Sequence, residues 1–231
     1  MRKEGQAPKI DLDTENKQKK NPIHKEEKRL NTQRSKRKNM AYNKNQLYKD
    51  LLIKHYSNIW GKKFRERTWD RGPMKGLSSD FSILEFEPSL NRNMWTYSTC
   101  GMSTFTHIRP IELHVFSSIQ DDSILELLTS VSYYHNVDDN LDLGHTVNFG
   151  RSWQDSSTCS YGLISLPYLD GPDLEIFNPS KEGLKIVHCY WLIPITEAEL
   201  EFKKQFGLET LEERFDETQF NYVNPQRESV V

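Results

Sequence analysis

The chain changes character at about residue 39, and this break limits the region that is able to fold. Residues 1–39 contain no aromatic residue and few aliphatic ones. A segment of this kind buries too little apolar surface to offset the entropy of ordering it. The sequence therefore predicts a disordered basic tail at residues 1–39, one folded domain at residues 40–222 and a flexible C-terminus at residues 223–231.

The net charge changes sign at the same break. Residues 1–39 carry 13 Lys and Arg against 6 Asp and Glu, a net charge of +7, whereas the remaining residues carry 18 against 27, a net charge of −9. The two parts are therefore expected to have different partners. Arg34 and residues 36–38 form a cluster typical of nonspecific phosphate contacts. Because no aromatic residue interleaves with these charges, we favour a solvated tail over a specific nucleic-acid site.

Several features indicate a cytoplasmic protein. The N-terminal residues lack the apolar core of a secretory signal. The longest apolar run, residues 186–195, is shorter than the ~20 residues that a helix needs to cross a bilayer, so we expect no membrane contact. The three cysteines, Cys100, Cys159 and Cys189, have no spacing that indicates a disulfide framework or a metal site, and we interpret them as small core residues.

The apolar spacing predicts an α/β domain of the α+β kind, in which helices flank a mixed sheet. Leucines and aromatic residues recur every three or four positions from about Asn45 to Trp60 and predict the first helix. Apolar and polar residues alternate from Ile111 to Ser117, which is typical of a sheet covered on one face. The predicted strands are residues 81–87, 95–103, 111–117, 145–149, 161–169, 173–177 and 185–195.

Two further helices are marked by capping-box spacing, in which a Ser or Thr precedes a Glu by three residues. Ser123 and Glu126 predict the start of a helix that ends near residue 136. Thr196 and Glu199 predict the start of another, which Gly207 interrupts.

The sequence gives little support for catalysis or for a bound metal. It contains no G-x-S-x-G, P-loop, G-x-G-x-x-G or H-E-x-x-H motif. Ser103 lacks the second glycine of a nucleophile elbow, so we interpret it as a strand residue. The histidines of the domain lack the spacing of metal ligands. We therefore expect a protein that is not an enzyme and needs no cofactor and no metal.

The acidic segment at residues 138–144 has a weak likeness to a calcium-binding loop. Asp138, Asn140 and Asp142 alternate as ligands would, but Gly144 falls one place late and Phe149 occupies the position of the bidentate glutamate. Two alternatives remain for this segment. It is either an exposed polar turn or an acidic contact loop for a basic partner.

The order of several short motifs resembles the suppressor-of-fused domain family over about residues 45–220. In the first half the matching segments are residues 80–85, 95–103 and 111–115. In the second half they are residues 161–169, 174–177 and 191–196, followed by Glu199, Phe202, Gly207, Leu211 and Phe215.

The resemblance implies a function in protein binding. Bacterial members of the family are implied to be immunity proteins that bind and neutralise a toxin encoded by a neighbouring gene, and the animal relatives sequester a transcription factor. A net charge of −9 would steer a basic toxin toward the domain, and nucleases are candidates because they are cationic. The alternative is a regulatory module that sequesters another intracellular protein without catalysis.

The resemblance also indicates where a partner would bind. Animal relatives capture a peptide by adding a strand to a sheet, and the corresponding region falls at the end of the second helix and the next strand. Exposed charges there are expected to speed association, and buried aromatic anchors to slow dissociation. The candidate contacts are the anchors Tyr133, Tyr134 and Trp153, the charges Asp138, Asp139 and Asp142, and His145; Trp69 and Tyr168 are further candidate anchors.

Overall fold

The structure, a computed structural model, describes residues 22–72, 76–103, 109–138, 140–180 and 184–231, with side chains at all of these except 22–25 and 36–43. The chain divides into two units between Asn43 and Lys44, and the described residues of the first unit are 22–43. The elements in chain order are α1 (Pro22–Trp60), β1 (Phe64–Arg67), β2 (Ser82–Phe86), β3 (Trp95–Cys100), β4 (Ile111–Ser117), α2 (Ser123–Val137), β5 (Thr146–Asn148), β6 (Tyr161–Ser165), α3 (Pro172–Glu175), β7 (Ile176–Phe177), β8 (Val187–Ile195), α4 (Glu197–Phe206) and α5 (Leu208–Thr218).

The first helix begins well before the predicted Asn45. The structure assigns helix from Pro22, so the predicted disordered tail is helical over its second half, and residues 1–21 lie outside the described residues. The side chains of residues 26–35 are all exposed, so burial does not hold this part of α1. Its many Lys, Arg, Glu and Gln residues have high intrinsic helix propensity, a factor that the prediction of a disordered tail did not weigh.

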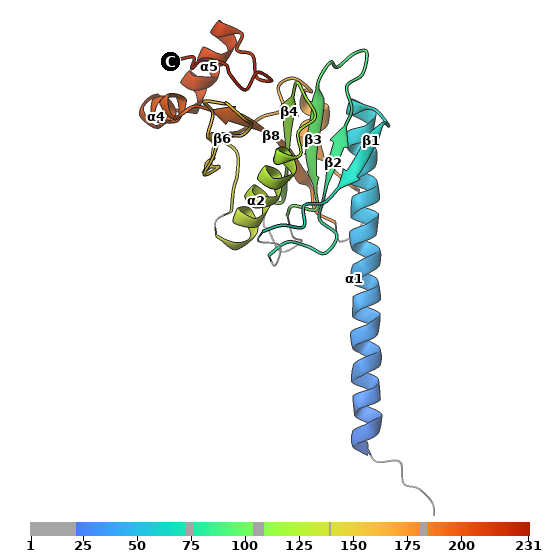
Figure 1. The fold of residues 1–231 in the computed structure, drawn as a ribbon. Helices are drawn as coiled ribbons and strands as arrows, with labels where there is room; N and C mark the ends of the chain where they lie inside the picture. The colour runs from blue at the N-terminus through green and yellow to red at the C-terminus, as the bar shows by residue number, and fades with distance from the viewer. Residues whose placement is uncertain (1–21, 73–75, 104–108, 139, 181–183) are drawn as a thin grey trace, which may run out of the picture. The chain divides into compact units, whose positions relative to one another are not determined.

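The second unit is built on one mixed sheet, which confirms the predicted fold class. In the described residues, eight strands form this sheet in the order β1-β2-β3-β4-β8-β6-β5, and β7 pairs with β8. β4 and β8 run parallel, and the other neighbours are antiparallel. α2 lies across one face of the sheet (Figure 1), where its apolar side chains join those of β2, β3 and β4 in one core cluster. β5 and β1 are therefore the two edges of the main sheet.

The sheet is covered on both faces at β4, which corrects the prediction of a single covered face. All seven residues of β4 are buried. On the second face Tyr48 of α1 donates a hydrogen bond to Glu112 (2.7 Å), and Trp60 of α1 lies 5.3 Å from the His114 ring. The alternation of polar residues along β4 therefore reflects buried polar groups and not exposure to solvent. The Glu112 carboxylate has hydrogen-bond partners, whereas the His114 ring is surrounded by aromatic side chains.

Several predicted strands differ from the structure in detail. β1 was not predicted, because it lies in a short polar stretch between α1 and β2 whose pairing partner is distant in sequence. The predicted strand at residues 173–177 is mostly the turn of helix α3, followed by the short β7. The predicted strand at residues 185–195 begins two residues later, at Val187, and includes Pro194, which pairs with Gly162 of β6.

One of the two predicted capping boxes forms. The Thr196 hydroxyl accepts from the N–H of Glu199 (3.2 Å), and the Glu199 carboxylate accepts from the N–H of Thr196 (2.8 Å). At α2 the predicted box is wrong, because the helix has Asp122 as its N-cap residue and shows no side-chain cap. Glu126 is instead paired with Arg151 at 3.3 Å.

The C-terminal residues are docked on the second unit, which corrects the prediction of a flexible C-terminus at residues 223–231. The Arg227 guanidinium is buried and forms a two-point ion pair with Glu199, with nitrogen-to-oxygen distances of 2.6 and 2.7 Å. The N–H of Val230 also donates to Glu199 (3.1 Å). The segment is held by a partner that lies far away in the sequence, so its polar composition did not reveal its order.

The three cysteines are free and buried, as predicted. None of the described helices combines the length and the apolar character that crossing a bilayer requires.

His114 makes the stability of the fold depend on pH. Burial, and then the nearby Arg92 guanidinium, lower the pKa of His114 to about 3, whereas the unfolded chain binds this proton with a pKa of about 6.5. The folded state binds fewer protons between these values, so stability falls as the pH drops below about 6.5. From pH 7 to pH 5 the expected loss from His114 is about 2 kcal/mol.

The substitution His114→Leu should remove this part of the pH dependence. Urea unfolding at pH 7, 6 and 5 measures it, and the exposed His145 offers a matched control, because His145→Gln should keep the dependence of the unaltered protein. Equal pH dependence in the His114→Leu variant and the unaltered protein would contradict the assignment.

Candidate functional site

The predicted binding region contains a surface hollow between α2 and the strand β5. The hollow has a volume of about 370 Å³. The structure brings Tyr134 to this hollow together with the backbone of β5. Its lining residues are Glu126, Leu127, Ser130, Val131 and Tyr134 of α2 and residues 146–151.

The outer edge of β5 presents backbone groups to this hollow. The N–H of Ile164 donates to the carbonyl of His145 (2.9 Å), and the N–H of Phe149 donates to the carbonyl of Ser160 (3.0 Å). Because inward and outward groups alternate along an antiparallel strand, the N–H and C=O of Thr146 and Asn148 point away from β6. This edge therefore offers donors and acceptors to an added strand.

Of the predicted contact residues that the structure describes, Tyr134 lines the hollow and His145 directly precedes β5. Tyr134, Asp138 and His145 are exposed. Tyr133 is half-buried, and its ring lies so close to Gly76 that an added Cβ would come within 3.1 Å of it. Asp142 pairs with Arg109 at 3.3 Å, which reduces the charge that the acidic segment presents.

Two of the predicted contacts do not join this surface. Trp153 is only 1% exposed and belongs to the core cluster under α2. Its assignment as a partner anchor is therefore wrong, because an anchor has to be accessible before binding. Asp139 lies outside the described residues.

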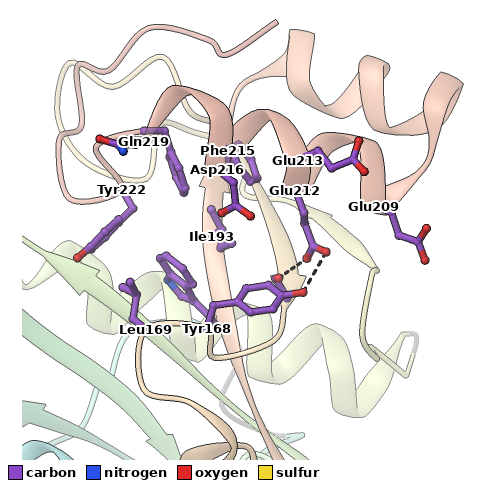
Figure 2. Close-up of a pocket in the computed structure, with 13 residues that line it drawn as sticks. Tyr168, Leu169, Ile193, Glu209, Glu212, Glu213, Phe215, Asp216, Gln219 and Tyr222 are labelled. Atoms are coloured by element: carbon purple, nitrogen blue, oxygen red, sulfur yellow. Dashed lines mark hydrogen bonds between the residues drawn. The ribbon is translucent and has the colours of Figure 1, made fainter.

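A larger groove lies beside α5 (Figure 2). Its volume is about 640 Å³, and it is lined by residues of β6, β8, α5 and the segments that follow β6 and α5. Trp191 and Ile193 of β8 and Phe215 of α5 line it and are almost fully buried. Tyr168 and Leu169 lie at its margin with 58% and 44% of their surfaces exposed. The groove therefore combines a rigid apolar base with an accessible aromatic rim.

The aromatic side chains of the groove pack against one another. The Phe215 and Phe220 rings are stacked with centroids 4.3 Å apart. Trp191 meets Tyr222 edge to face at 5.2 Å. Contacts of this kind hold the rings in place.

Four carboxylates of α5 line the same groove. They occupy positions 209, 212, 213 and 216, a spacing that places them along one side of a helix. Glu212 accepts hydrogen bonds from Ser165 (2.5 Å) and Tyr168 (3.1 Å), drawn as dashed lines in Figure 2. Burial, and then Glu212, raise the pKa of Tyr168 to about 12, so its hydroxyl remains a donor. The acidic spacing was visible in the sequence, but only the apolar residues of this helix were interpreted.

A serine and a histidine meet in the structure without forming a catalytic pair. The Ser103 hydroxyl lies 3.1 Å from Nε2 of His135. Nδ1 of His135 accepts the N–H of Leu141 (3.0 Å), so the ring proton is on Nε2 and points toward the serine. The Ser103 hydroxyl itself donates to the carbonyl of Ile111 (2.8 Å). The pair therefore lacks a general base that faces the nucleophile.

Among the described residues, no three His, Cys, Asp or Glu side chains gather as the ligands of a metal ion. The arrangement of the surface is suited to binding a polypeptide, because its notable features are a free strand edge and an aromatic groove with acidic sides.

Comparison with known proteins identifies relatives of this fold. A putative suppressor of fused homologue from Neisseria gonorrhoeae FA 1090 has 29% sequence identity and a TM-score of 0.69, with 80% of this chain and 97% of that chain covered. The chain in a Sufu-Fu complex has 15% identity and a TM-score of 0.60, with coverage of 79% and 92%. Drosophila Suppressor of Fused has 15% identity and a TM-score of 0.57, and the match spans 78% of this chain and 50% of that one.

No curated protein matches the sequence. The sequence profile of the suppressor of fused protein (SUFU) family matches residues 78–228. The match begins in the segment before β2 and reaches Arg227 in the docked C-terminal segment. With this match over most of the folded unit, and with the same mixed sheet, the chain belongs to the suppressor of fused family.

Proposed function

We propose that this protein is a cytoplasmic immunity protein that binds and neutralises a toxin encoded by a neighbouring gene. It acts by protein contact and not by catalysis, and a segment of the toxin adds a strand to the free edge of β5. The observation that carries the proposal is the outward direction of the Thr146 and Asn148 backbone groups beside a hollow of about 370 Å³.

The geometry of the hollow favours an added strand over a helix. A strand that pairs with β5 would lie about 4.8 Å from it in the plane of the sheet, beside the hollow that α2 lines. Backbone hydrogen bonds would then supply affinity, and alternate side chains would meet Tyr134 and Val131 of α2 and supply specificity. A relative solved in a Sufu-Fu complex supports a family function in protein binding.

The charge of the folded part favours a basic partner. Residues 40–231 carry a net charge of −9, which raises the rate of encounter with a cationic protein at low ionic strength. A toxin that acts on nucleic acid has the required surface, since it has to bind phosphates.

The alternative function is a regulatory module that sequesters another intracellular protein through the same edge. The two functions differ in the identity of the partner. An immunity protein binds the product of the adjacent gene, whereas a regulator is not restricted to it.

The substitution Thr146→Pro tests the strand edge. Proline removes an outward N–H and places its ring where the added strand would lie, while the bonds between β5 and β6 remain, since edge positions tolerate proline. We expect the dissociation rate from the product of the neighbouring gene to rise about tenfold or more, which corresponds to about 1.4 kcal/mol. Surface plasmon resonance measures this rate.

Thr146→Val is the matched control, because it changes the side chain and keeps the N–H. Circular dichroism establishes that both variants are folded. If Thr146→Pro dissociates at the rate of Thr146→Val, the edge is not the binding element. If the unaltered protein does not bind the neighbouring product, the immunity function is wrong and the regulatory function replaces it.

A further inference from the structure

The acidic side of α5 contains like charges that repel one another and lower the stability of the helix. Glu209 and Glu213, and likewise Glu212 and Asp216, are like charges four positions apart, and such pairs destabilise a helix. No Lys, Arg or His is among the described residues that line the groove. The groove therefore holds negative charge that no groove-lining cation balances.

The cations of α5 itself and of the segment that follows it are Arg214 and Arg227, and both are paired with other groups. Arg214 of α5 pairs with Glu217 at 2.8 Å. The Arg227 guanidinium lies 5.2 Å from the centre of the Phe220 ring, but its hydrogen bonds go to Glu199 and the carbonyl of Pro194. Both are thereby paired with groups that do not line the groove, and a positive group of a partner would complement the α5 carboxylates.

The aromatic side chains of the groove fit the same kind of group. A guanidinium or ammonium ion is attracted to the face of an aromatic ring, and the groove offers Tyr168, Tyr222 and Phe220 at half-buried or exposed positions. Of these rings Tyr168 and Tyr222 are the ones open to a partner, because Phe220 is already packed against Phe215 and the Arg227 guanidinium. Arginine suits this setting better than lysine, because its planar head stacks on a ring while its N–H groups reach a carboxylate. Tyr168 and Glu212, which are hydrogen-bonded to each other, place a ring and a carboxylate side by side.

We propose that the groove beside α5 is a second interaction surface, which binds an arginine-bearing segment of a partner protein. The arginine head lies between the aromatic rim and the α5 carboxylates, and neighbouring aliphatic side chains of the segment cover Leu169 and Ile193. A volume of about 640 Å³ accommodates a few side chains and not a folded domain. An anionic ligand would be repelled, and a purely apolar segment would bury the carboxylates without a partner.

This surface is separate from the β5 edge, and the inference does not rest on the immunity function. It is tested with a synthetic probe, a blocked hexapeptide in which arginine alternates with leucine. The matched peptide has citrulline in place of arginine, which keeps the shape and removes the charge. Isothermal titration gives the dissociation constant of each, and amide NMR shifts show where each binds.

We expect the arginine peptide to bind at least about tenfold more tightly than the citrulline peptide, a difference of about 1.4 kcal/mol. Its shifts should lie on residues 165–169 and 209–222, and the affinity should fall as salt is raised. Failure of the arginine peptide to bind, equal affinity of the two peptides, or shifts confined to other surfaces would each overturn the proposal.

A triple variant, E209Q/E213Q/D216N, tests the carboxylates directly. Glu212 is kept, because it is hydrogen-bonded to Ser165 and Tyr168. The variant should bind the arginine peptide at least tenfold more weakly while its melting temperature is unchanged or higher, since like-charge repulsion in α5 is removed. The control E201Q/E217Q/E228Q removes the same number of charges from exposed positions outside the groove and should bind normally. Equal weakening in both variants would show general electrostatics and overturn the assignment to this groove.

Discussion

Replacing Arg227 with alanine is expected to lower the free energy of unfolding by about 3–5 kcal/mol, since one partner of a buried ion pair is lost while the other stays buried. Arg227 is 6% exposed and Glu199 is fully buried. Without Arg227, both oxygens of the Glu199 carboxylate lose a donor and keep only the N–H groups of Thr196 and Val230. The same carboxylate completes the capping box of α4, so the loss affects the start of that helix and the docked C-terminal segment together.

Thermal unfolding measures this effect. At about 2–4 °C per kcal/mol for a domain of this size, the Arg227→Ala variant should melt roughly 6–20 °C below the unaltered protein. Glu228→Ala is the matched control, because the neighbouring Glu228 is exposed, and it should change the melting temperature by less than about 2 °C. If the two variants melt alike, the C-terminal segment is as flexible as its sequence suggested.

The elements that sequence reasoning identified depend on local signals. The Thr196 and Glu199 box, the end of α4 at Gly207 and the apolar strand β8 all lie within short windows whose spacing defines them. The fold class followed from these elements and from the order of short motifs. Local spacing alone was not sufficient in every case, because Ser123 and Glu126 have the same spacing as the box at α4 and form no box.

The features that were missed depend on partners distant in sequence. The Arg227 side chain is ordered by Glu199, and β1 is ordered by β2. The exposure of surface side chains also depends on residues that are distant in sequence. Trp153 and Tyr134 are both large aromatic residues in the predicted binding region, but only the tertiary structure shows that the first is 1% and the second 36% exposed. The acidic side of α5 was readable from its spacing, whereas the groove it faces is built from strands far away in the chain.

The buried carboxylate of Glu112 organises the centre of the sheet in a way that no local pattern indicates. Oε1 accepts from the Tyr48 hydroxyl (2.7 Å) and the N–H of Gly101 (2.9 Å), and Oε2 accepts from the Thr99 hydroxyl (2.5 Å). The N–H of Met102 reaches both oxygens, at 3.1 and 3.2 Å. Glu112 thereby links α1, β3 and β4 inside the protein, and the residue types alone gave it the appearance of an exposed position on a half-covered sheet.

Replacing Glu112 with leucine is expected to lower the free energy of unfolding by about 3 kcal/mol or more, because each buried donor that loses its acceptor costs about 1–3 kcal/mol. Glu112→Gln is the matched comparison and should cost clearly less, since its carbonyl oxygen can still accept from Gly101 and Met102 while its amide donates to Thr99.

The unaltered protein and the Glu112→Gln variant should also differ in how their stability depends on pH. Burial raises the pKa of Glu112, so the folded state binds more protons than the unfolded state above the ordinary carboxyl range. The stability of the unaltered protein therefore falls as the pH rises from that range through the raised pKa. The Gln variant has no such group, so its stability relative to the unaltered protein should improve over the same pH interval. His114 is present in both proteins, so its own pH dependence cancels in this comparison. Urea unfolding of the three proteins from pH 5 to pH 8 measures both effects. A leucine variant as stable as the glutamine variant would show that the donors find other partners. A difference in stability between the glutamine variant and the unaltered protein that stays constant from pH 5 to pH 8 would show that Glu112 does not change its charge in this range.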